Sequence, residues 1–139
     1  MRTVFADAAY WIAMSNPRDS LHARAKELSK SHQSMRLVTS EVVLTEFLDD
    51  YCHRGEFFRK AAVAAVERLR KTSSVTIIPQ TSAQFRDALT LYAARSDKTW
   101  SLTDCASFRI MERYQIREAL THDTHFEQAG FRALLRGKL

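Results

Sequence analysis

Four short apolar runs, each bounded by turn or capping residues, divide the chain at intervals. They lie at residues 3–6, 37–39, 75–78 and 118–121. Their length and their content of β-branched and other apolar residues are typical of buried strands. A further short strand is expected near the end of the chain, where Phe126, Phe131, Leu134 and Leu135 supply core side chains.

Between these runs the apolar residues recur at helical spacing. Helices are expected at residues 8–14, after Asp19, after Ser40, and at 56–71, 82–94 and 102–114. In the helix at 82–94 the inner face is expected to carry Phe85, Ala88, Leu89 and Tyr92. Strands that alternate with helices predict an α/β fold, with a mainly parallel sheet of about four to five strands flanked by helices.

Asp104 stands out because the helical pattern places it where the helix at 102–114 packs. Ser101 and Asp104 have the spacing of a capping box, and Asp104, Phe108 and Met111 fall on one stripe. A carboxylate on a packed face must be paired, hydrogen-bonded or bound to a metal. The simpler interpretation is that Asp104 serves only as the capping residue of this helix.

Three other acids occur where strands end or where the following helices begin. Asp7 follows the first strand and Asp123 follows the fourth, while Glu46 lies at the border of the apolar stripe of the helix after Ser40. Sites in parallel sheets form at the carboxyl ends of the strands, so these acids and Asp104 are expected to face one crevice. Taken alone, Glu46 could equally be a solvated flanking residue.

Such a group of carboxylates predicts a hard divalent cation. Close carboxylates repel one another unless a cation lies between them. Oxygen ligands without His or Cys favour Mg²⁺ or Mn²⁺, which clamp a phosphate and lower the pKa of a bound water. A metal-dependent phosphodiesterase or nuclease is therefore expected.

The composition of the chain excludes only a few classes of function. The 139 residues suit a single domain spanning 1–139, with 45% hydrophobic residues and a net charge of +5 that permits a nucleic-acid partner. The basic residues of the middle section, among them Arg54, Arg59 and Arg68, also fit an ordinary solvated surface.

A cytoplasmic protein is expected from the cysteines and the N-terminus. Cys52 and Cys105 lie far apart and are expected to be buried, reduced thiols. No apolar run is long enough for a membrane span, and Asp7 comes too early for a signal peptide.

The order of these motifs resembles a PIN domain, and more narrowly the VapC-type ribonuclease toxins of toxin–antitoxin pairs. The matching fragments are Val-Phe-Ala-Asp ending at Asp7, Ser-Glu-Val-Val-Leu-Thr-Glu ending at Glu46, Leu-Thr-Asp ending at Asp104 and Thr-His-Asp ending at Asp123. Each fragment is short, but their order and spacing extend from Arg2 to about Phe131.

The resemblance implies a PIN-like three-layer fold and a Mg²⁺- or Mn²⁺-dependent endonuclease that cuts single-stranded RNA. It implies that Asp7, Glu46, Asp104 and Asp123 are the acidic metal ligands, with Thr103 as a supporting hydroxyl. It further implies in-line attack by a metal-activated water that leaves a 5′-phosphate and a 3′-hydroxyl. The partners it implies are a second copy of the chain and an antitoxin that covers the site, commonly with an Arg among the acids.

The sequence departs from the family pattern after the first acid. Asp7 is followed by Ala8, where many members have a hydroxyl residue, so a hydroxyl contact to Asp7 is either missing or supplied by Thr103 or Ser107. Asp97 could be a further outer acid, although a loop salt bridge to Lys98 or an Arg is the simpler expectation.

Other interpretations of the same residues remain open. His122, Asp123 and His125 could form a zinc site, but adjacent strand residues point apart. A Ser/His/Asp hydrolase lacks its nucleophile elbow, and a phosphatase with nucleophilic Asp7 lacks a second Asp two residues later. A catalytically silent module that binds RNA or protein, or a housekeeping nuclease without an antitoxin, would have the same fold.

Three aromatic residues are expected near the mouth of the crevice. Tyr10, Trp11 and Trp100 could stack on RNA bases, or could serve packing or a dimer interface.

Overall fold

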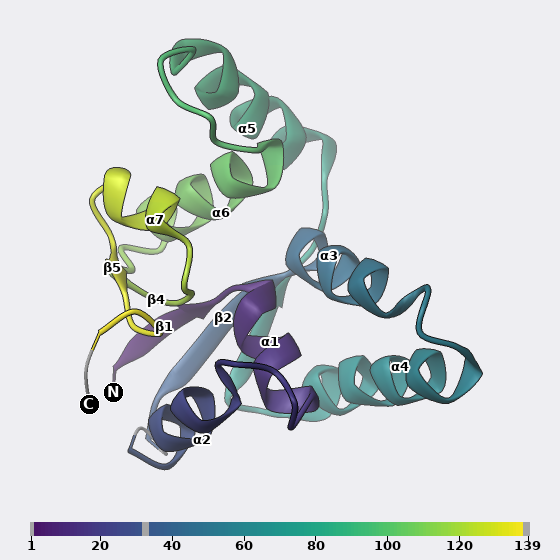
Figure 1. Cartoon of the computed structure of the whole chain (residues 1–139). Helices are drawn as coiled ribbons and strands as arrows, with labels where there is room; N and C mark the ends of the chain where they lie inside the picture. Colours follow the sequence, from purple (N-terminus) through teal and green to yellow (C-terminus); the bar gives the residue numbers. More distant parts are fainter. Residues whose placement is uncertain (1, 32–33, 138–139) are drawn as a thin grey trace.

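The computed structural model describes residues 2–31 and 34–137 and shows one five-stranded sheet flanked by helices (Figure 1). All strand pairs are parallel, and the strand order is β3-β2-β1-β4-β5. The strands are β1 (Thr3–Ala6), β2 (Arg36–Ser40), β3 (Val75–Ile78), β4 (Glu118–Leu120) and β5 (Arg132–Ala133). The predicted α/β fold, with a parallel sheet flanked by helices, is confirmed.

Among the residues that the structure describes, seven helices connect the strands and cover the sheet. They are α1 (Ala8–Ser15), α2 (His22–Ser31), α3 (Glu41–Tyr51), α4 (Glu56–Lys71), α5 (Ser82–Ala94), α6 (Leu102–Arg113) and α7 (Thr124–Gln128). In Figure 1, α5, α6 and α7 lie on one side of the sheet and α1, α2 and α4 on the other, with α3 between the two groups. Helix α3 contacts α1, α4 and α6, and so joins the two halves of the molecule.

Local sequence explains where these helices begin. Ser40 Oγ accepts a hydrogen bond from the Val43 amide, and Ser101 and Asp104 form the predicted capping box at the start of α6. Gly55 precedes α4 with φ of 92°, a conformation that residues with a Cβ rarely adopt, so the turn between α3 and α4 depends on this glycine.

The central strand is buried along all but its first residue. Val4, Phe5 and Ala6 of β1 have no exposed surface, and Phe5 pairs in register with Val38 of β2 and Ala119 of β4. Both faces of this strand are therefore apolar, as is usual where helices cover a parallel sheet on both sides. The polar Asp7 follows at the point where this burial ends.

An aromatic cluster holds α6, α7 and the loop before α6 together. The rings of Phe108 and Phe126 meet edge to face at 4.9 Å, and those of Trp100 and Phe108 do the same at 4.9 Å. The indole of Trp100 also donates to Gln128 Oε1 at 3.0 Å. This cluster locates the helix that carries Asp104.

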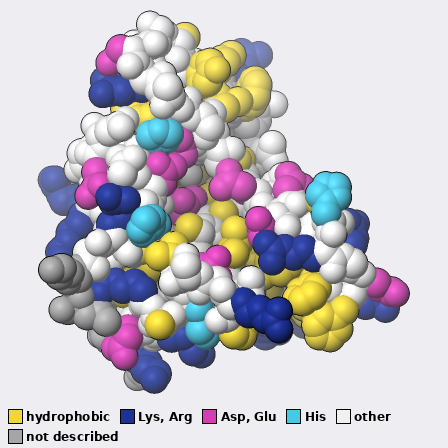
Figure 2. Space-filling view, in the orientation of Figure 1, with side chains coloured by type: hydrophobic (Ala, Val, Ile, Leu, Met, Phe, Trp, Pro, Cys, Tyr) yellow, Lys and Arg dark blue, Asp and Glu magenta, His cyan; other side chains and the backbone are white. Residues whose placement is uncertain are grey.

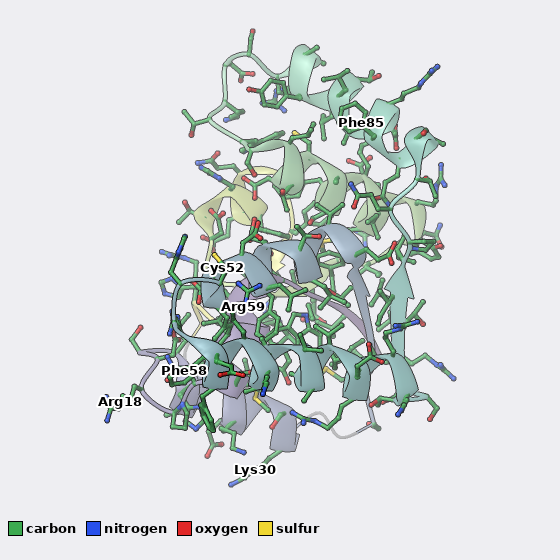
Figure 3. All side chains as sticks on the ribbon, turned by 90° about the vertical axis from the view of Figure 1, so that its right-hand side faces the viewer. Arg18, Lys30, Cys52, Phe58, Arg59 and Phe85 are labelled. Carbon is green, nitrogen blue, oxygen red and sulfur yellow. The ribbon has the colours of Figure 1, made fainter. Side chains whose placement is uncertain are left out.

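Several expectations about burial were wrong. On α5 only Ala88 of the expected inner face is buried, whereas Phe85, Leu89 and Tyr92 are 50%, 46% and 51% exposed. Figure 3 shows Phe85 on α5 at one end of the molecule, away from Phe58 and Arg59 on α4. Helical spacing correctly grouped these residues on one face, but spacing alone does not say whether that face meets the core.

Two smaller expectations were also wrong. The helix expected at 102–114 ends at Arg113, and Tyr114, its C-cap residue, is 51% exposed. Cys105 is buried as expected, but Cys52 at the end of α3 is only partly buried, and both are free thiols. Within the described parts of the chain, no helix combines the length and apolar character needed to cross a membrane.

The aromatic cluster generates a stability prediction. Replacing the fully buried Phe108 by Ala (Phe108→Ala) should lower the free energy of unfolding by about 3–5 kcal/mol, because it removes buried apolar area and leaves a cavity. Urea denaturation followed by circular dichroism measures this change. The matched control is Phe57→Ala on α4, where the ring is 76% exposed and the expected change is within about 0.5 kcal/mol. Equal losses in the two variants would contradict the assignment of Phe108 to the core.

Candidate active site

The structure brings the four predicted acids to one edge of the sheet. Asp7 follows β1 as the N-cap of α1, and Asp123 follows β4 as the N-cap of α7. Asp104 lies in the first turn of α6, and Glu46 lies in the middle of α3. Figure 2 shows acidic side chains gathered across the middle of this face, with most Lys and Arg side chains around them.

The four carboxylates are close enough to influence one another electrostatically. Burial is the main reason why the pKa values of Asp7 and Glu46 are raised, and the neighbouring charges add to it. Asp104 and Asp123 raise the pKa of Asp7, and Asp7, Asp104 and Asp123 raise the pKa of Glu46. In the part of the chain that the structure describes, none of the four acids forms an ion pair with Lys or Arg. The repulsion among them is therefore not offset by a built-in guanidinium or ammonium group.

Asp7 is the most enclosed of these acids. Its backbone amide donates to Leu120 O at 3.2 Å, which extends the pairing of β1 with β4 by one residue. Burial raises the pKa of the Asp7 carboxyl to about 6, although hydrogen bonds from the Thr121 hydroxyl and the Ala8 amide act in the opposite direction.

Thr121 supplies the hydroxyl contact that the residue after Asp7 lacks. Its Oγ1 donates to Asp7 Oδ2 at 2.8 Å and accepts a hydrogen bond from the Asp123 amide at 3.1 Å. The sequence left open whether this contact is missing or comes from Thr103 or Ser107, and neither alternative was right. The hydroxyl of Ser107 is buried and has no hydrogen-bond partner among the described residues.

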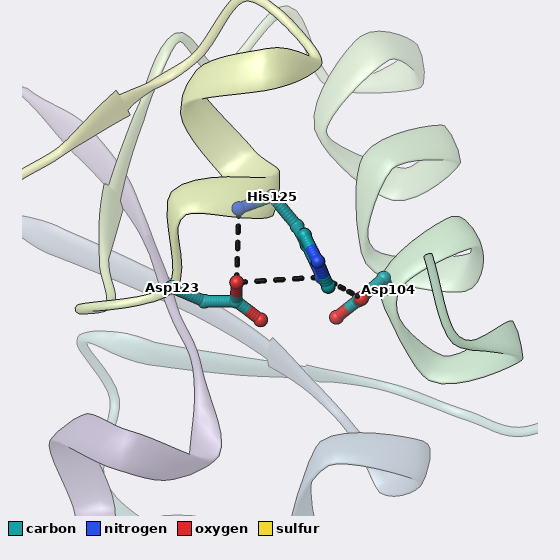
Figure 4. A group of neighbouring side chains, drawn as sticks. All are labelled: Asp104, Asp123 and His125. Atoms are coloured by element: carbon teal, nitrogen blue, oxygen red, sulfur yellow. Dashed lines mark hydrogen bonds and ion pairs between the residues drawn. The ribbon is translucent and has the colours of Figure 1, made fainter. Parts of the chain in front are cut away.

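Asp104 and Asp123 meet on the two sides of His125 (Figure 4). The Nδ1 atom of His125 is 2.9 Å from Asp104 Oδ2 and 3.4 Å from Asp123 Oδ1. One potential ligand atom from each of these three residues lies within 4.8 Å of the other two. All three side chains are partly buried, so the group faces the crevice but remains accessible.

Glu46 lies at the rim of the site. The residue as a whole is exposed. Even so, the surrounding protein shields its carboxyl from water, and this desolvation, together with the charges of the other acids, raises the pKa of the carboxyl to about 7. Thr103 lines a cavity of about 170 Å³ together with Glu46, Asp49 and Gln80. Among the described residues, the Thr103 hydroxyl forms no hydrogen bond with any of the four acids.

This donor set fits a divalent cation. Asp104 and Asp123 each have one oxygen held by a hydrogen bond, at Oδ2 and Oδ1 respectively, and the other oxygen of each carboxylate is not engaged by any described residue. Carboxylate oxygens are hard ligands, and a cation among them would remove the repulsion that raises the pKa values of Asp7 and Glu46. Such a cation could polarise a phosphate and activate a water molecule.

The remaining site expectations had mixed outcomes. Asp97 forms the expected loop salt bridge, with Arg95 Nε 3.0 Å from its Oδ1. Tyr10, Trp11 and Trp100 are buried and serve packing, with the Trp11 indole donating to Thr39 Oγ1 at 3.2 Å.

The zinc hypothesis selected two of the three residues that the structure groups. Asp123 and His125 belong to the cluster with Asp104, but the exposed His122 does not. Sequence reasoning thus missed His125 as a companion of Asp104, and Thr121 as the link between Asp7 and Asp123. The signal for Thr121 was a hydroxyl residue at the end of a strand and two positions before an acid.

Comparisons with known proteins agree with this geometry. The family model described as PIN domain matches residues 4–132. The chain is 31% identical over 132 residues to the 23S rRNA-specific endonuclease VapC20 of Mycobacterium tuberculosis, in strains CDC 1551 / Oshkosh and ATCC 25618 / H37Rv. The alignment covers 92% of this chain and 95% of VapC20.

A solved structure shows the same relationship in three dimensions. The crystal structure of Mycobacterium tuberculosis VapC20, described as a Sarcin-Ricin loop cleaving toxin, superimposes with a TM-score of 0.82 at 30% sequence identity. The superposition covers 92% of this chain and 95% of that one. The chain therefore belongs to the PIN domain family, and within that family it is a relative of the VapC toxins.

Proposed function

We propose that this protein is a metal-dependent endoribonuclease that cuts single-stranded RNA and acts as the toxin of a toxin–antitoxin pair. The observation that carries this proposal is the convergence of four carboxylates, from four separate segments, at the carboxyl edge of the sheet, with no neutralising Lys or Arg among the residues that the structure describes. The similarity to an rRNA-specific endonuclease supports RNA as the substrate class.

Asp7, Glu46, Asp104 and Asp123 are assigned as the ligands of Mg²⁺ or Mn²⁺, with Thr103 in a supporting position beside Glu46. When bound, the cation would supply charge stabilisation at the scissile phosphate and an activated water. Thr121 and Ser101 orient the carboxylates of Asp7 and Asp104 through their hydrogen bonds. The net charge of +5 favours binding of the flanking RNA backbone.

The protein partners follow from the same proposal. An antitoxin would cover the crevice and place a basic side chain among the acids, where it would substitute for the cation. A neighbouring reading frame for a small DNA-binding protein would distinguish a toxin from a housekeeping nuclease. A toxin that inhibits translation by cleaving RNA would act in the cytoplasm, and residues 1–139 are proposed to form a single nuclease domain.

The exposed stripe on α5 is proposed as a homodimer interface. Phe85, Leu89 and Tyr92 follow one another at helical spacing and are about half exposed, which is typical of a face that another subunit covers. A second copy of the chain can bury the same stripe reciprocally around a twofold axis.

The first prediction concerns RNA cleavage. The purified protein should cut single-stranded RNA, or a 23S rRNA fragment, with Mg²⁺ or Mn²⁺ and not with EDTA. Asp104→Asn should lower the rate by about 100-fold or more, because it removes a charged ligand while keeping the shape of the side chain. The matched control is Asp97→Asn, since Asp97 is 61% exposed and pairs only with the nearby Arg95 in the loop. Cleavage that persists in EDTA would contradict the proposal, and no cleavage of any RNA would favour a silent binding module.

The second prediction concerns pH and the stability of the metal-free protein. Because the pKa of Asp7 is raised from 3.8 to about 6, the folded state binds a proton more tightly than the unfolded state. This contribution to stability is complete below about pH 4 and is lost as the pH rises through about 6. Asp7→Asn should thus be more stable than wild type above pH 7, by up to about 3 kcal/mol. Urea denaturation in EDTA across pH 4–8 measures the difference between the two proteins.

The control for this experiment is the addition of Mn²⁺ at pH 7.5. A cation among the carboxylates should stabilise wild type and reduce the advantage of Asp7→Asn. A difference between the two proteins that does not change with pH would show that the charge of Asp7 is not responsible.

The third prediction tests the α5 interface. Leu89→Glu should convert the dimer to a monomer in sedimentation velocity measurements, because it places a charge at the centre of the apolar stripe. Val63→Glu on α4, where Val63 is 54% exposed, is the matched control and should remain dimeric. A wild-type monomer at micromolar concentration, or a dimer that Leu89→Glu leaves intact, would refute the proposed interface.

A further inference from the structure

His125 belongs to the cluster that it forms with Asp104 and Asp123, and it is the member that is not an acid. Both nitrogens of its ring have a hydrogen-bond partner. Its Nδ1 lies 2.9 Å from Asp104 Oδ2, and its Nε2 lies 3.3 Å from the Thr99 hydroxyl. The imidazole therefore spans from the loop before α6 to the carboxylate that begins that helix.

The hydrogen-bond partners of the imidazole determine which of its two nitrogens carries hydrogen. An ionised carboxylate only accepts hydrogen bonds, so Nδ1 must donate to Asp104. In the neutral imidazole Nε2 is then an acceptor, and the Thr99 hydroxyl is the donor that faces it. Nδ1, the ring nitrogen that faces the two carboxylates, carries hydrogen and has no lone pair for a metal, and the lone pair of Nε2 accepts from the Thr99 hydroxyl. In this arrangement His125 therefore orients a ligand and is not one itself.

The bond from His125 selects one oxygen of Asp104. The amide of Ser101 donates to the same Oδ2 at 3.0 Å, so two donors hold this oxygen from two different segments. Within the described residues, Asp104 Oδ1 receives no hydrogen bond. The carboxylate is thus fixed in rotation about its last bond, with one oxygen used by the protein and the other left for a cation.

His125 is itself held in place by its neighbours in α7. Asp123 Oδ1 accepts from the His125 amide at 2.9 Å, which caps this short helix, and the adjacent Phe126 is 1% exposed in the aromatic cluster. The position of the imidazole is therefore determined by the second acid of the group and by the core. Through these contacts His125 joins Asp104 to Asp123, which are 19 positions apart in the sequence.

We propose that His125 is a positioning residue that presents Asp104 Oδ1 to the catalytic cation by holding Oδ2 through its Nδ1–H. This inference rests on the proposed metal-dependent function and adds a residue outside the four acids. Partners of this kind commonly change metal affinity by about 10- to 100-fold when they are removed. The role requires a donor at the place of Nδ1 and does not require the imidazole ring as such.

Two substitutions of His125 test the roles of the two ring nitrogens separately. The side-chain amide of Asn reaches the place of Nδ1, whereas the amide of Gln reaches the place of Nε2. Mn²⁺ affinity, measured by calorimetry on the whole chain without RNA, should stay within about threefold of wild type in His125→Asn and fall by about 10-fold or more in His125→Gln. With RNA, the same loss in His125→Gln should appear at subsaturating Mn²⁺ and diminish as Mn²⁺ is raised.

The control variant is His122→Asn, at an exposed histidine three residues away whose side chain is outside the cluster. It should bind Mn²⁺ as wild type does, and urea denaturation should show that all three variants fold. Equal affinity of the Asn and Gln variants would overturn the proposal. If both kept the wild-type value, His125 would have no part in metal binding, and if both lost it, the imidazole would be needed as a direct ligand.

Because these titrations contain no RNA, they test His125 separately from the activity. A wild-type protein that binds Mn²⁺ but cuts no RNA would refute the proposed function and leave the positioning role testable. A wild-type protein that cuts RNA, with His125→Gln binding Mn²⁺ as tightly as wild type, would refute only the positioning role.

Discussion

Mutual repulsion among four carboxylates is the constraint on which the site depends. The chain holds them with neutral donors, such as the Thr121 hydroxyl and the Ser101 amide, and supplies no Lys or Arg partner within the described residues. The negative charge of the four acids must therefore be balanced by a cation or a basic group from outside the described part of the chain. A metal ion at this location would supply that balance, and under the proposed function a basic side chain of an inhibitor would compete with it.

Such a site costs stability, and the surrounding structure compensates. The raised pKa of Asp7 means that its ionised form is disfavoured in the folded protein near neutral pH. The aromatic cluster around Phe108 and the buried residues Val4, Phe5 and Ala6 of β1 contribute apolar burial next to the segments that carry Asp104 and Asp7. Two of the four acids are therefore attached to buried parts of the core, which hold their positions against repulsion.

Local sequence patterns predicted the five strands and six of the seven helices of the described residues, and they predicted that the four acids would lie at one edge of the sheet, but they did not predict the short helix α7. The strands are short apolar runs, and the alternation of strands with helices places Asp7 and Asp123 at the same edge of a parallel sheet. The contact of Thr121 with Asp7 was not predictable in this way, because it depends on the register between β1 and β4. On α5 the sequence pattern was clear but its interpretation was wrong. Phe85 and Leu89 lie on one face of the helix as their spacing predicts, but this face does not pack against the core.

The position of β4 in the sheet has a consequence for synthesis of the protein. Strand β1, which is made first, lies between β2 and β4, and β4 begins only at Glu118. A nascent chain that has passed Asp104 already contains three of the four acids, but it lacks Thr121 and the strand that aligns Asp7. Phe5 pairs with Ala119 and Ala6 with Leu120, so this pairing cannot form before β4 has been made. The site of an enzyme that attacks RNA is thus incomplete on the ribosome until β4 and Asp123 have emerged.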